Sequence, residues 1–383
     1  MLRHRLRKVT LFFSNSLISA ETNMKNAVDP NANICDTYIM MKANTHMEHF
    51  EDLLFESSDL LTRVMHGEVK FTRKWDGSPS IFFGVDDNGD AWIARKGLFN
   101  KDAKKYYKRS DFDADEKFPE ELKIPLWNTL VYLGRSWAGP KNDNYFVQGD
   151  LMFTDGTDSG HFHPNTIRYA TSLIPKKAKV GIVWHTRYVD GDEGLWIEYG
   201  ASVKEHFKLS DELWMINAHD EIEDFTPNFG HLAAVGNYSH LSEKTKLMFK
   251  TYQNALIKGT TDGSIMDFLF DHMAKAVDSV KQDATKSRKM VEYKVVFEEL
   301  AANPNLASDY LKMQTYKMFL LKQFDKVHSQ YVPYLQKKDG MLNQTHHEGY
   351  ALFDEHGNAA KLVNRKQFSA ANFSDDYVKG WSK

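Results

Sequence analysis

Cysteine is almost absent from this chain of 383 residues, since Cys35 is the single one. One cysteine excludes an intramolecular disulfide and any zinc site built from several cysteines, and it fits a reducing cytoplasm. The sequence also lacks an apolar run of the roughly 20 residues that a membrane-spanning helix needs. Its net charge of −3 excludes a surface that attracts polyanions everywhere. We therefore expect a cytoplasmic protein without a membrane partner, in which any surface for nucleic acid is a local patch.

The apolar residues that are present are enough for a substantial core. Hydrophobic residues make up 42% of the chain and aromatic residues 13%, and the length allows one large domain or two ordinary ones. The first 44 residues differ from the rest, because basic residues at positions 3–8 precede a short apolar patch and an asparagine-rich tract. The order is similar to that of a signal or transit peptide, but the patch is too short for a secretory core. We interpret residues 1–44 as a disordered or loosely attached leader.

The stretch around Lys74 has the clearest local pattern in the chain. Val69 and Phe71 alternate with polar neighbours, as in a half-buried strand, and residues 81–83 form a second, apolar strand pattern. Between them, Asp76-Gly77 followed by Ser-Pro favours a tight turn. The pattern predicts a strand–loop–strand hairpin with Lys74 at the rim of the loop.

Hydrophobic periodicity predicts the other elements. Helical spacing, with capping residues at Thr45 and Asp262, occurs at residues 45–65, 125–137, 242–257, 262–280, 287–302 and 306–330. Strand patterns occur at residues 91–94, 145–153, 179–188, 349–354 and 359–363. We therefore expect an α+β fold in which one domain, residues 45–205 plus 341–383, is interrupted by a mostly α-helical insertion at residues 206–340.

The segment at residues 101–121 is highly charged and leaves two interpretations open. Its basic half carries Tyr106 and Tyr107, and an acidic half follows at once. A solvated loop with internal charge balance is one interpretation. A loop that follows phosphates and offers aromatic rings for stacking is the other.

Two histidine pairs are candidate metal ligands. His161 and His163 could face one metal ion if extended, but no carboxylate or cysteine lies at a supporting spacing. His346 and His347 are adjacent, so on a strand they point to opposite faces. We expect no histidine metal site.

Lys74-Trp75-Asp76-Gly77 resembles the Lys-x-Asp-Gly signature of the covalent nucleotidyltransferases, which include ATP-dependent DNA and RNA ligases and mRNA capping enzymes. Four further stretches resemble motifs of this superfamily in the right order. They are residues 91–97 around Arg95, 145–151 ending in Gly149-Asp150, 179–185 with Trp184, and Glu348-Gly349 followed by Lys361. The sequence departs from the pattern at Ala94, Asp150, His185 and Val363, which replace a serine, a glutamate, an acidic residue and a second lysine. Lys366 is the candidate to take the place of that lysine.

The resemblance implies a fold, an activity and cofactors. The fold is a nucleotidyltransferase (adenylation) domain of two packed antiparallel sheets with helices. The activity is an ATP-dependent polynucleotide ligase that forms a covalent lysyl-AMP and seals 5′-phosphate to 3′-hydroxyl ends, with Mg²⁺ or Mn²⁺. The chain is closest in pattern to phage-type RNA ligases, so we expect a monomer that acts on nucleic-acid ends, RNA favoured over DNA, in the cytoplasm (that of the host for a phage protein).

The resemblance also implies a role for each site residue. Lys74 is the nucleophile, with Asp76 and Gly77 in its loop. Arg95 and Lys361 hold phosphates, Trp184 stacks on adenine, and Asp150 and Glu348 contact the ribose or a metal ion. A lysine attacks only as a neutral amine, and with a pKa of about 10.4 fewer than about one in 10³ are neutral near pH 7. Arg73, Arg95, Lys361 and a divalent ion are expected to lower that pKa.

Three alternatives stay open at this stage. A DNA ligase and a capping-type guanylyltransferase are alternatives within the same superfamily. A non-catalytic protein of the same fold that binds nucleotides or nucleic-acid ends is the third. Basic residues of the insertion are candidates for binding a nucleic-acid backbone: Lys275, Lys281, Lys286, Arg288 and Lys289.

Overall fold

The computed structural model describes residues 47–57, 59–191, 194–208, 210–222, 225–228, 235–262 and 264–380. The expected leader at residues 1–44 lies outside the described residues. Among those described, Gly236–Tyr310 form one compact unit, here called the helical unit, and the others form a second, the sheet unit. The boundary at residue 310 lies within helix α8, Leu306–Phe324.

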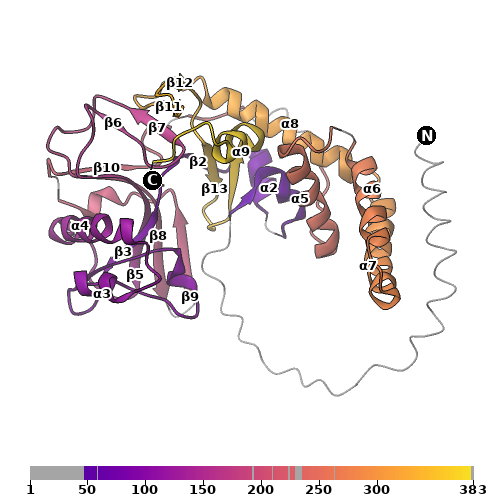
Figure 1. Ribbon diagram of the computed structural model, residues 1–383, viewed down its shortest axis with the longest axis horizontal. Coiled ribbons are helices and arrows are strands. Elements are labelled where there is room, and N and C mark those ends of the chain that lie inside the picture. The colour runs from indigo at the N-terminus through magenta and orange to yellow at the C-terminus, as the bar shows by residue number, and fades with distance from the viewer. Residues whose placement is uncertain are drawn as a thin grey trace, which may run out of the picture. The chain divides into compact units, whose positions relative to one another are not determined.

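The largest sheet of the sheet unit has six strands. Their order is β10 (Leu213–Asn217), β8 (Val180–Gly191), β5 (Tyr145–Thr154), β3 (Ser80–Val85) and β4 (Ala91–Ala94), with β9 (Gly194–Tyr199) also paired to β8. All pairs are antiparallel except β10 with β8. Helix α4, Glu120–Ser136, covers one face of this sheet (Figure 1), where its leucines join Ile81, Phe83 and Ile182 in one buried cluster.

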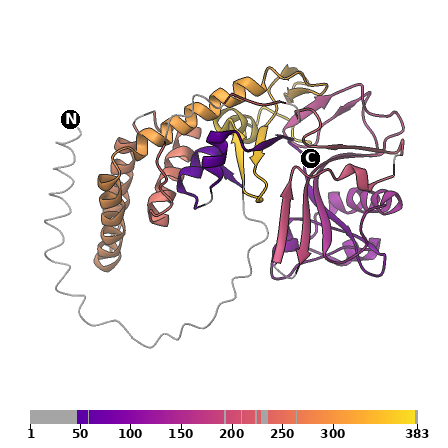
Figure 2. The ribbon, with the colours of Figure 1, turned by 180° about the vertical axis from the view of Figure 1, so that it is seen from behind.

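Two smaller sheets complete the unit. One has the order β1 (Glu48–His49), β14 (Ala359–Val363), β13 (Gly349–Phe353) and β2 (Lys70–Lys74). The other has the order β12 (Leu342–Gln344), β11 (Val332–Gln336), β7 (Ile167–Ala170) and β6 (His161–Phe162). Figures 1 and 2 both show β13 and β14, in yellow, beside the indigo helix α2, Leu60–His66.

The expected hairpin around Lys74 is wrong. Strand β2 pairs with β13 of the small sheet, whereas β3 pairs with β4 and β5 of the six-stranded sheet. Residues 75–79 therefore carry the chain from one sheet to another. Local turn signals indicate that the chain changes direction, but they do not say whether the two strands pair with each other.

The remaining helices that periodicity predicts agree with it in place more closely than in their ends, whereas the short helices at residues 96–99, 109–114, 204–206 and 365–373 were not expected. In the sheet unit the remaining helices are η2 (Phe50–Phe55), η3 (Lys96–Phe99), α3 (Arg109–Ala114), η4 (Lys204–His206) and α9 (Arg365–Phe373). In the helical unit they are α5 (Glu243–Ile257), α6 (Ile265–Asp278) and α7 (Asp283–Ala302). Glu48 lies in strand β1 rather than in a helix start, and α6 is capped by the Ser264 side chain rather than by Asp262.

The helical insertion is shorter than residues 206–340. Strands β10 and β11 lie inside that range and join sheets of the sheet unit, so only residues 236–310 form a separate unit. Most strand pairs are antiparallel, and β1 with β14 and β10 with β8 are the parallel exceptions among the described strands. The α+β class is confirmed.

A buried ion pair joins helix α8 to η2 within the sheet unit. Lys317 is 4% exposed, and its Nζ lies 2.7 Å from both carboxylate oxygens of the fully buried Glu51. Next to it, Arg365 donates to Asp52 over 2.9 Å. A buried carboxylate is tolerated because such cations neutralise it.

Replacing Lys317 by methionine is expected to lower the free energy of unfolding by about 3–5 kcal/mol, because Glu51 then stays buried with only Arg365 nearby at 3.6 Å. Urea denaturation measures the loss. The matched control is Lys322→Met, since Lys322 is an exposed lysine of the same helix. Equal stability of the Lys317 and Lys322 variants would contradict the expectation.

Candidate functional site

A cavity of about 1190 Å³ lies beside residues 75–79, where the chain passes from the sheet that contains β2 to the six-stranded sheet. Ligand cavities in proteins usually measure about 300–1,000 Å³, so this one has room for a nucleotide and part of a second substrate. The side chains expected at the site that line it are Lys74, Gly77, Arg95, Asp150 and Lys361. They come from strands β2, β5 and β14 and from the loops after β2 and β4.

Lys74 ends strand β2 in an ion pair with Glu348. Its Nζ lies 2.6 Å from Glu348 Oε1, and the two side chains are 30% and 10% exposed. Burial lowers the pKa of Lys74, but Glu348, Asp150 and Asp76 raise it by more, so the net shift is upward. Burial, helped by the carboxylates of Asp76 and Asp150, raises the pKa of Glu348 to about 7 despite the attraction of Lys74. Lys74 and Glu348 thus both hold protons more tightly than the same groups in water.

The loop after Lys74 is fixed by Asp76 and Gly77. Asp76 is 2% exposed and accepts hydrogen bonds from Ile167 N at 2.6 Å and Asn165 Nδ2 at 2.7 Å. Burial raises its pKa, and these donors oppose the shift. A Cβ at position 77 would lie 2.4 Å from Asp150 Cβ, so only glycine lets the loop lie against β5. Asp76 holds the loop and does not line the cavity.

Trp184 does not face the cavity, and the expectation that it stacks on adenine is wrong. Its side chain is fully buried in the core under α4 and stacks on Phe207 at a centroid distance of 5.3 Å. A register shift between Gln148 and Gly149 of β5 pairs Gly149 with Trp184 and leaves His185 as the extra residue. A Cβ at position 149 would lie 2.7 Å from the Trp184 ring, so glycine there makes room for the buried indole.

His185 takes the cavity position next to Asp150. It lines the cavity, and its Nε2 lies 3.9 Å from Asp150 Oδ1. Burial acts to raise the pKa of Asp150, but His185 and Lys74 outweigh it, so the carboxylate is held below its usual range. Asp150 is therefore held in its charged form beside Lys74.

Lys361 is the cation of β14 that faces the cavity. It pairs with Ala351 on β13, and burial together with Lys74 lowers its pKa. Val363, which stands where the resemblance implies a second lysine, is buried. Lys366 is exposed on α9 and does not line the cavity, so it does not replace that lysine. Lys96, directly after Arg95, does line the cavity.

Arg73 was expected to help lower the pKa of Lys74, and the structure contradicts this. Its side chain is 2% exposed, and Nη1 lies 2.9 Å from Glu221 Oε2. Neighbouring residues on a strand point to opposite faces, so Arg73 points away from the face that carries Lys74. The net shift of the Lys74 pKa is also upward rather than downward.

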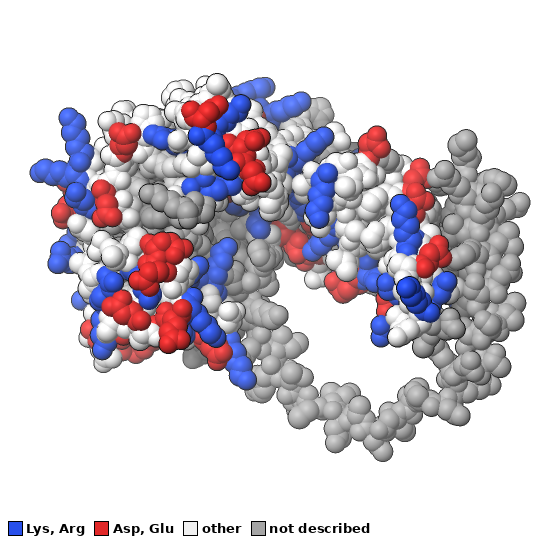
Figure 3. Space-filling model, viewed as in Figure 1, with Lys and Arg blue, Asp and Glu red and all other residues white. Residues whose placement is uncertain are grey.

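The cavity is lined by more cations than anions. Beyond Lys74 and the buried Arg73, the cationic lining residues are Arg95, Lys96, Lys101, Lys104, Lys117 and Lys361, and the acidic ones are Asp102, Asp115 and Asp150. On the face drawn in Figure 3, by contrast, blue and red side chains intermingle. The cationic surplus favours an anionic ligand in this cavity.

Internal charge balance, the first interpretation of residues 101–121, is confirmed, and phosphate binding by this segment stays a prediction. Lys104 forms a 2.9 Å ion pair with Asp115, which also accepts from Tyr106 Oη at 2.6 Å, so the loop does balance charge internally. These two donors lower the pKa of Asp115 to about 2. The same loop also forms one wall of the cavity.

The histidines of the first pair contact backbone carbonyls. His161 and His163 contact the carbonyls of Asp158 and Thr166 in their own loop. In the part of the chain that the structure describes, no group of three or more His, Cys, Asp or Glu is placed to hold a metal ion.

A family model matches residues 44–377, almost the whole described chain. The family is one of unknown function, DUF6267. The chain belongs to this family. No curated protein and no solved structure matches it significantly. Within the described residues of this DUF6267 member, no helix has the length and apolar character needed to cross a bilayer.

Sequence reasoning missed several residues of this cavity. Lys96 and His185 are direct neighbours of motif residues, so their proximity in sequence was a usable signal. Asn165 carries no such signal, because only the tertiary fold brings its loop to Asp76. Gln148 lines the cavity and is held by Ser80 and Tyr188.

The buried position of Trp184 leads to a stability prediction. Trp184→Ala is expected to lower the free energy of unfolding by about 3–5 kcal/mol, because it empties a core position. His185→Ala is expected to change it by less than about 1 kcal/mol, since that side chain borders the cavity. Urea denaturation of both variants measures the difference. A Trp184 variant as stable as the His185 variant would argue against the core position.

The pKa of Lys74 gives a second prediction. Glu348→Gln removes the largest attraction that keeps the amine protonated, so the pKa of Lys74 should fall. At pH 8 its modification by an amine reagent such as trinitrobenzenesulfonate should speed up on the order of tenfold per pKa unit. Peptide mass spectrometry measures the rate at Lys74, with the exposed Lys70 of the same strand as the internal control. An unchanged ratio of the two rates would count against the ion pair.

Proposed function

We propose that the protein is a covalent nucleotidyltransferase of the ATP-dependent polynucleotide ligase type, with RNA ends favoured as substrate. One observation carries the proposal. Residues far apart in sequence, namely Lys74, Arg95, Asp150 and Lys361, line one cavity rich in cations, and Glu348 is paired with Lys74 there, as the motif resemblance requires. Motif matches at random positions have no reason to converge on one site.

Lys74 is the nucleophile of the first step. In the resting site its amine is protonated and paired to Glu348. Because the pKa of Glu348 is about 7, this carboxylate is suited to take the ammonium proton when ATP binds. The Lys74 Nζ lone pair then attacks the α-phosphorus, the bond to the β-phosphate oxygen breaks, and pyrophosphate leaves. The product is a lysyl-AMP.

Cations around the cavity neutralise the phosphates in this proposal. Arg95, Lys96 and Lys361 line the cavity near the strand ends and are free to contact phosphate oxygens. Asp150 and Glu348 are oxygen donors of the kind that Mg²⁺ accepts alongside substrate phosphates. Two carboxylates fit an ion carried in by a nucleotide better than a fixed protein site, in line with the lack of a larger ligand cluster among the described residues. Such an ion supplies charge neutralisation.

The later steps use the second substrate. A 5′-phosphate oxygen attacks the phosphorus of lysyl-AMP, the P–N bond breaks, and Lys74 regains its proton. A 3′-hydroxyl oxygen then attacks the activated 5′-phosphorus, and AMP leaves. Each step is an in-line displacement, so positioning and charge neutralisation supply most of the rate. A DNA ligase would use the same steps, and a capping-type enzyme would transfer GMP instead.

A non-catalytic protein that binds nucleotides or nucleic-acid ends is the second candidate. A specific observation favours it: the pKa of Lys74 is raised, and the lysine implied at position 363 is replaced by a buried valine. A cation-lined cavity binds a nucleotide without turnover equally well. Covalent labelling separates the two candidates.

Purified protein mixed with ATP and Mg²⁺ is expected to gain the mass of one AMP through an acid-labile, base-stable bond to Lys74. Intact-mass and peptide mass spectrometry detect it. Lys74→Ala and Lys74→Arg should both abolish the adduct, because a guanidinium stays protonated and cannot attack. Both variants should stay folded, since the Lys74 side chain contributes little to the core.

Lys70→Ala is the matched control, because Lys70 lies on the same strand and is exposed. Lys96 is a poorer control, since it lines the cavity. GTP in place of ATP distinguishes a capping-type enzyme from a ligase. If the wild-type protein gains no nucleotide mass from either, the binding protein becomes the better proposal.

A further inference from the structure

Arg73, the residue before Lys74, is among the most buried charged residues described, at 2% exposure. Its Nη1 donates to Ser329 Oγ at 2.6 Å, pairs with Glu221 Oε2 at 2.9 Å and contacts His347 Nε2 at 2.5 Å. Its backbone N–H donates to Ala218 O at 2.9 Å. Burying a guanidinium costs free energy, so a buried arginine directly before Lys74 suggests a structural or functional role that offsets this cost.

The partners of Arg73 come from two segments that flank the helical unit in sequence. One is residues 218–222, directly after β10, and the other is residues 329–331, directly before β11. Glu221 joins them, because its carboxylate accepts from Ser329 Oγ and from Gln330 N at 2.9 Å. Glu221 and Ser329 therefore link the two segments to each other and to Arg73, the residue before Lys74.

The third partner, His347, is the residue before Glu348. Burial and the neighbouring Arg73 hold the pKa of His347 well below its usual range, so its imidazole is neutral and can accept from the guanidinium. Gly349 pairs with Lys74, and Tyr350 pairs with Arg73, across β13 and β2. Arg73, itself the neighbour of Lys74, thus contacts His347, the neighbour of Glu348.

We propose that Arg73 is a positioning residue that sets the geometry of the Lys74–Glu348 pair through its contacts with Glu221, Ser329 and His347. The inference rests on the proposed function, since its purpose is to aim the Lys74 amine at phosphorus. A misplacement of about 1 Å can cost on the order of 100-fold in rate. All three contacts are made by Nη1, so one buried nitrogen gathers Glu221, Ser329 and His347 around a single point.

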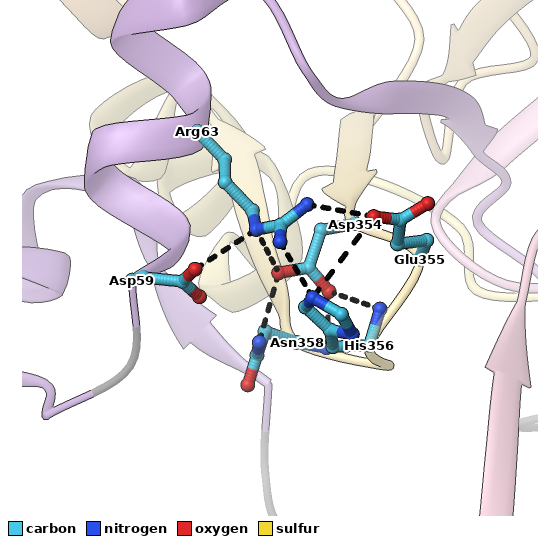
Figure 4. A network of polar contacts seen from close by, with 6 residues as sticks. All are labelled: Asp59, Arg63, Asp354, Glu355, His356 and Asn358. Atoms are coloured by element: carbon cyan, nitrogen blue, oxygen red, sulfur yellow. Dashed lines mark hydrogen bonds and ion pairs between the residues drawn. The ribbon is translucent and has the colours of Figure 1, made fainter.

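Arg63 is a matched control, because it contacts the turn between β13 and β14, at the end of β13 that is far from Lys74. Arg63 of α2 donates to Asp59 at 3.0 Å and to Glu355 at 3.1 Å, and lies 3.8 Å from the buried Asp354. Asp354 in turn accepts from the backbone N–H groups of His356 and Asn358 in the turn between β13 and β14 (Figure 4). Arg63 is thus an ion-paired arginine that holds β13 at its far end from Lys74.

The experiment compares Arg73→Met, Arg73→Lys and Ser329→Ala with Arg63→Met. Single-turnover formation of the Lys74 adduct gives the rate, and the Kd for α,β-methylene-ATP gives nucleotide binding. Arg73→Met should lose on the order of 100-fold in rate with Kd unchanged within about twofold. Arg73→Lys should keep part of the rate, and Arg63→Met should keep nearly all of it. Ser329→Ala, a small change that the fold should tolerate, should lose rate in the same direction as Arg73→Met.

Hydrogen exchange supplies a readout that needs no nucleotide. Exchange at residues 70–79 and 345–350 should rise in Arg73→Met and Ser329→Ala but not in Arg63→Met, whose effect should stay near residues 354–358. Wild-type rate in the Arg73 and Ser329 variants, or equal losses in the Arg73 and Arg63 variants, overturns the inference. If wild-type protein forms no adduct, the proposed function fails. Exchange then decides alone, and unchanged exchange at residues 70–79 in Arg73→Met overturns the positioning role as well.

Discussion

The ion pair between Lys74 and Glu348 is the constraint around which this site is arranged. Its two members end neighbouring strands, and pairing of Lys74 with Gly349 places Glu348 next to the amine. Asp76 and Asp150 add two more carboxylates nearby, and both raise the pKa of Lys74. The protein therefore keeps one cation among three acids, and the register of β2 with β13 must hold for the pair to exist.

The residues directly before and after Lys74 are buried and fix the position of its backbone. Before it, Arg73 is buried with Glu221 and His347. After it, Trp75 is 3% exposed and packs against Tyr169 and Tyr331 at centroid distances of 5.0 Å. The Lys74 side chain lies on the opposite face of the strand from Arg73 and Trp75, because alternate residues of a strand face opposite sides. The Lys74 side chain has four rotatable bonds, but its backbone is held in place by the buried residues on either side.

Sequence patterns located the longer helices, strands β2 to β5, β8, β13 and β14, and several residues that line the cavity, because those follow from local periodicity and from order along the chain. They missed the other described strands, which include β6, β7 and β9 to β12. They failed where the answer depends on pairing. Whether β2 pairs with β3 is decided by partners more than fifty residues away, and a turn signal carries no record of them. One bulge between β5 and β8 decides whether Trp184 or His185 faces the cavity, and both orders fit the same alternating pattern. Arg73 is next to Lys74 in sequence, which suggested a cation near its amine. Because adjacent strand residues face opposite sides, the Arg73 side chain instead lies on the other face of β2.

The charge of the cavity explains how such a resting pair could become reactive. In the resting site, carboxylates hold the Lys74 proton and the outer wall carries the surplus of Lys and Arg side chains. In the proposed reaction a phosphate chain would contact those cations and bring negative charge toward Asp150 and Glu348, which would raise the free energy of their ionised forms. Glu348, already with a pKa near 7, is the carboxylate that most readily takes a proton in response. In the proposed reaction the proton would then pass from Lys74 to Glu348, whose Oε1 lies 2.6 Å from Nζ, and leave the neutral amine that attacks phosphorus.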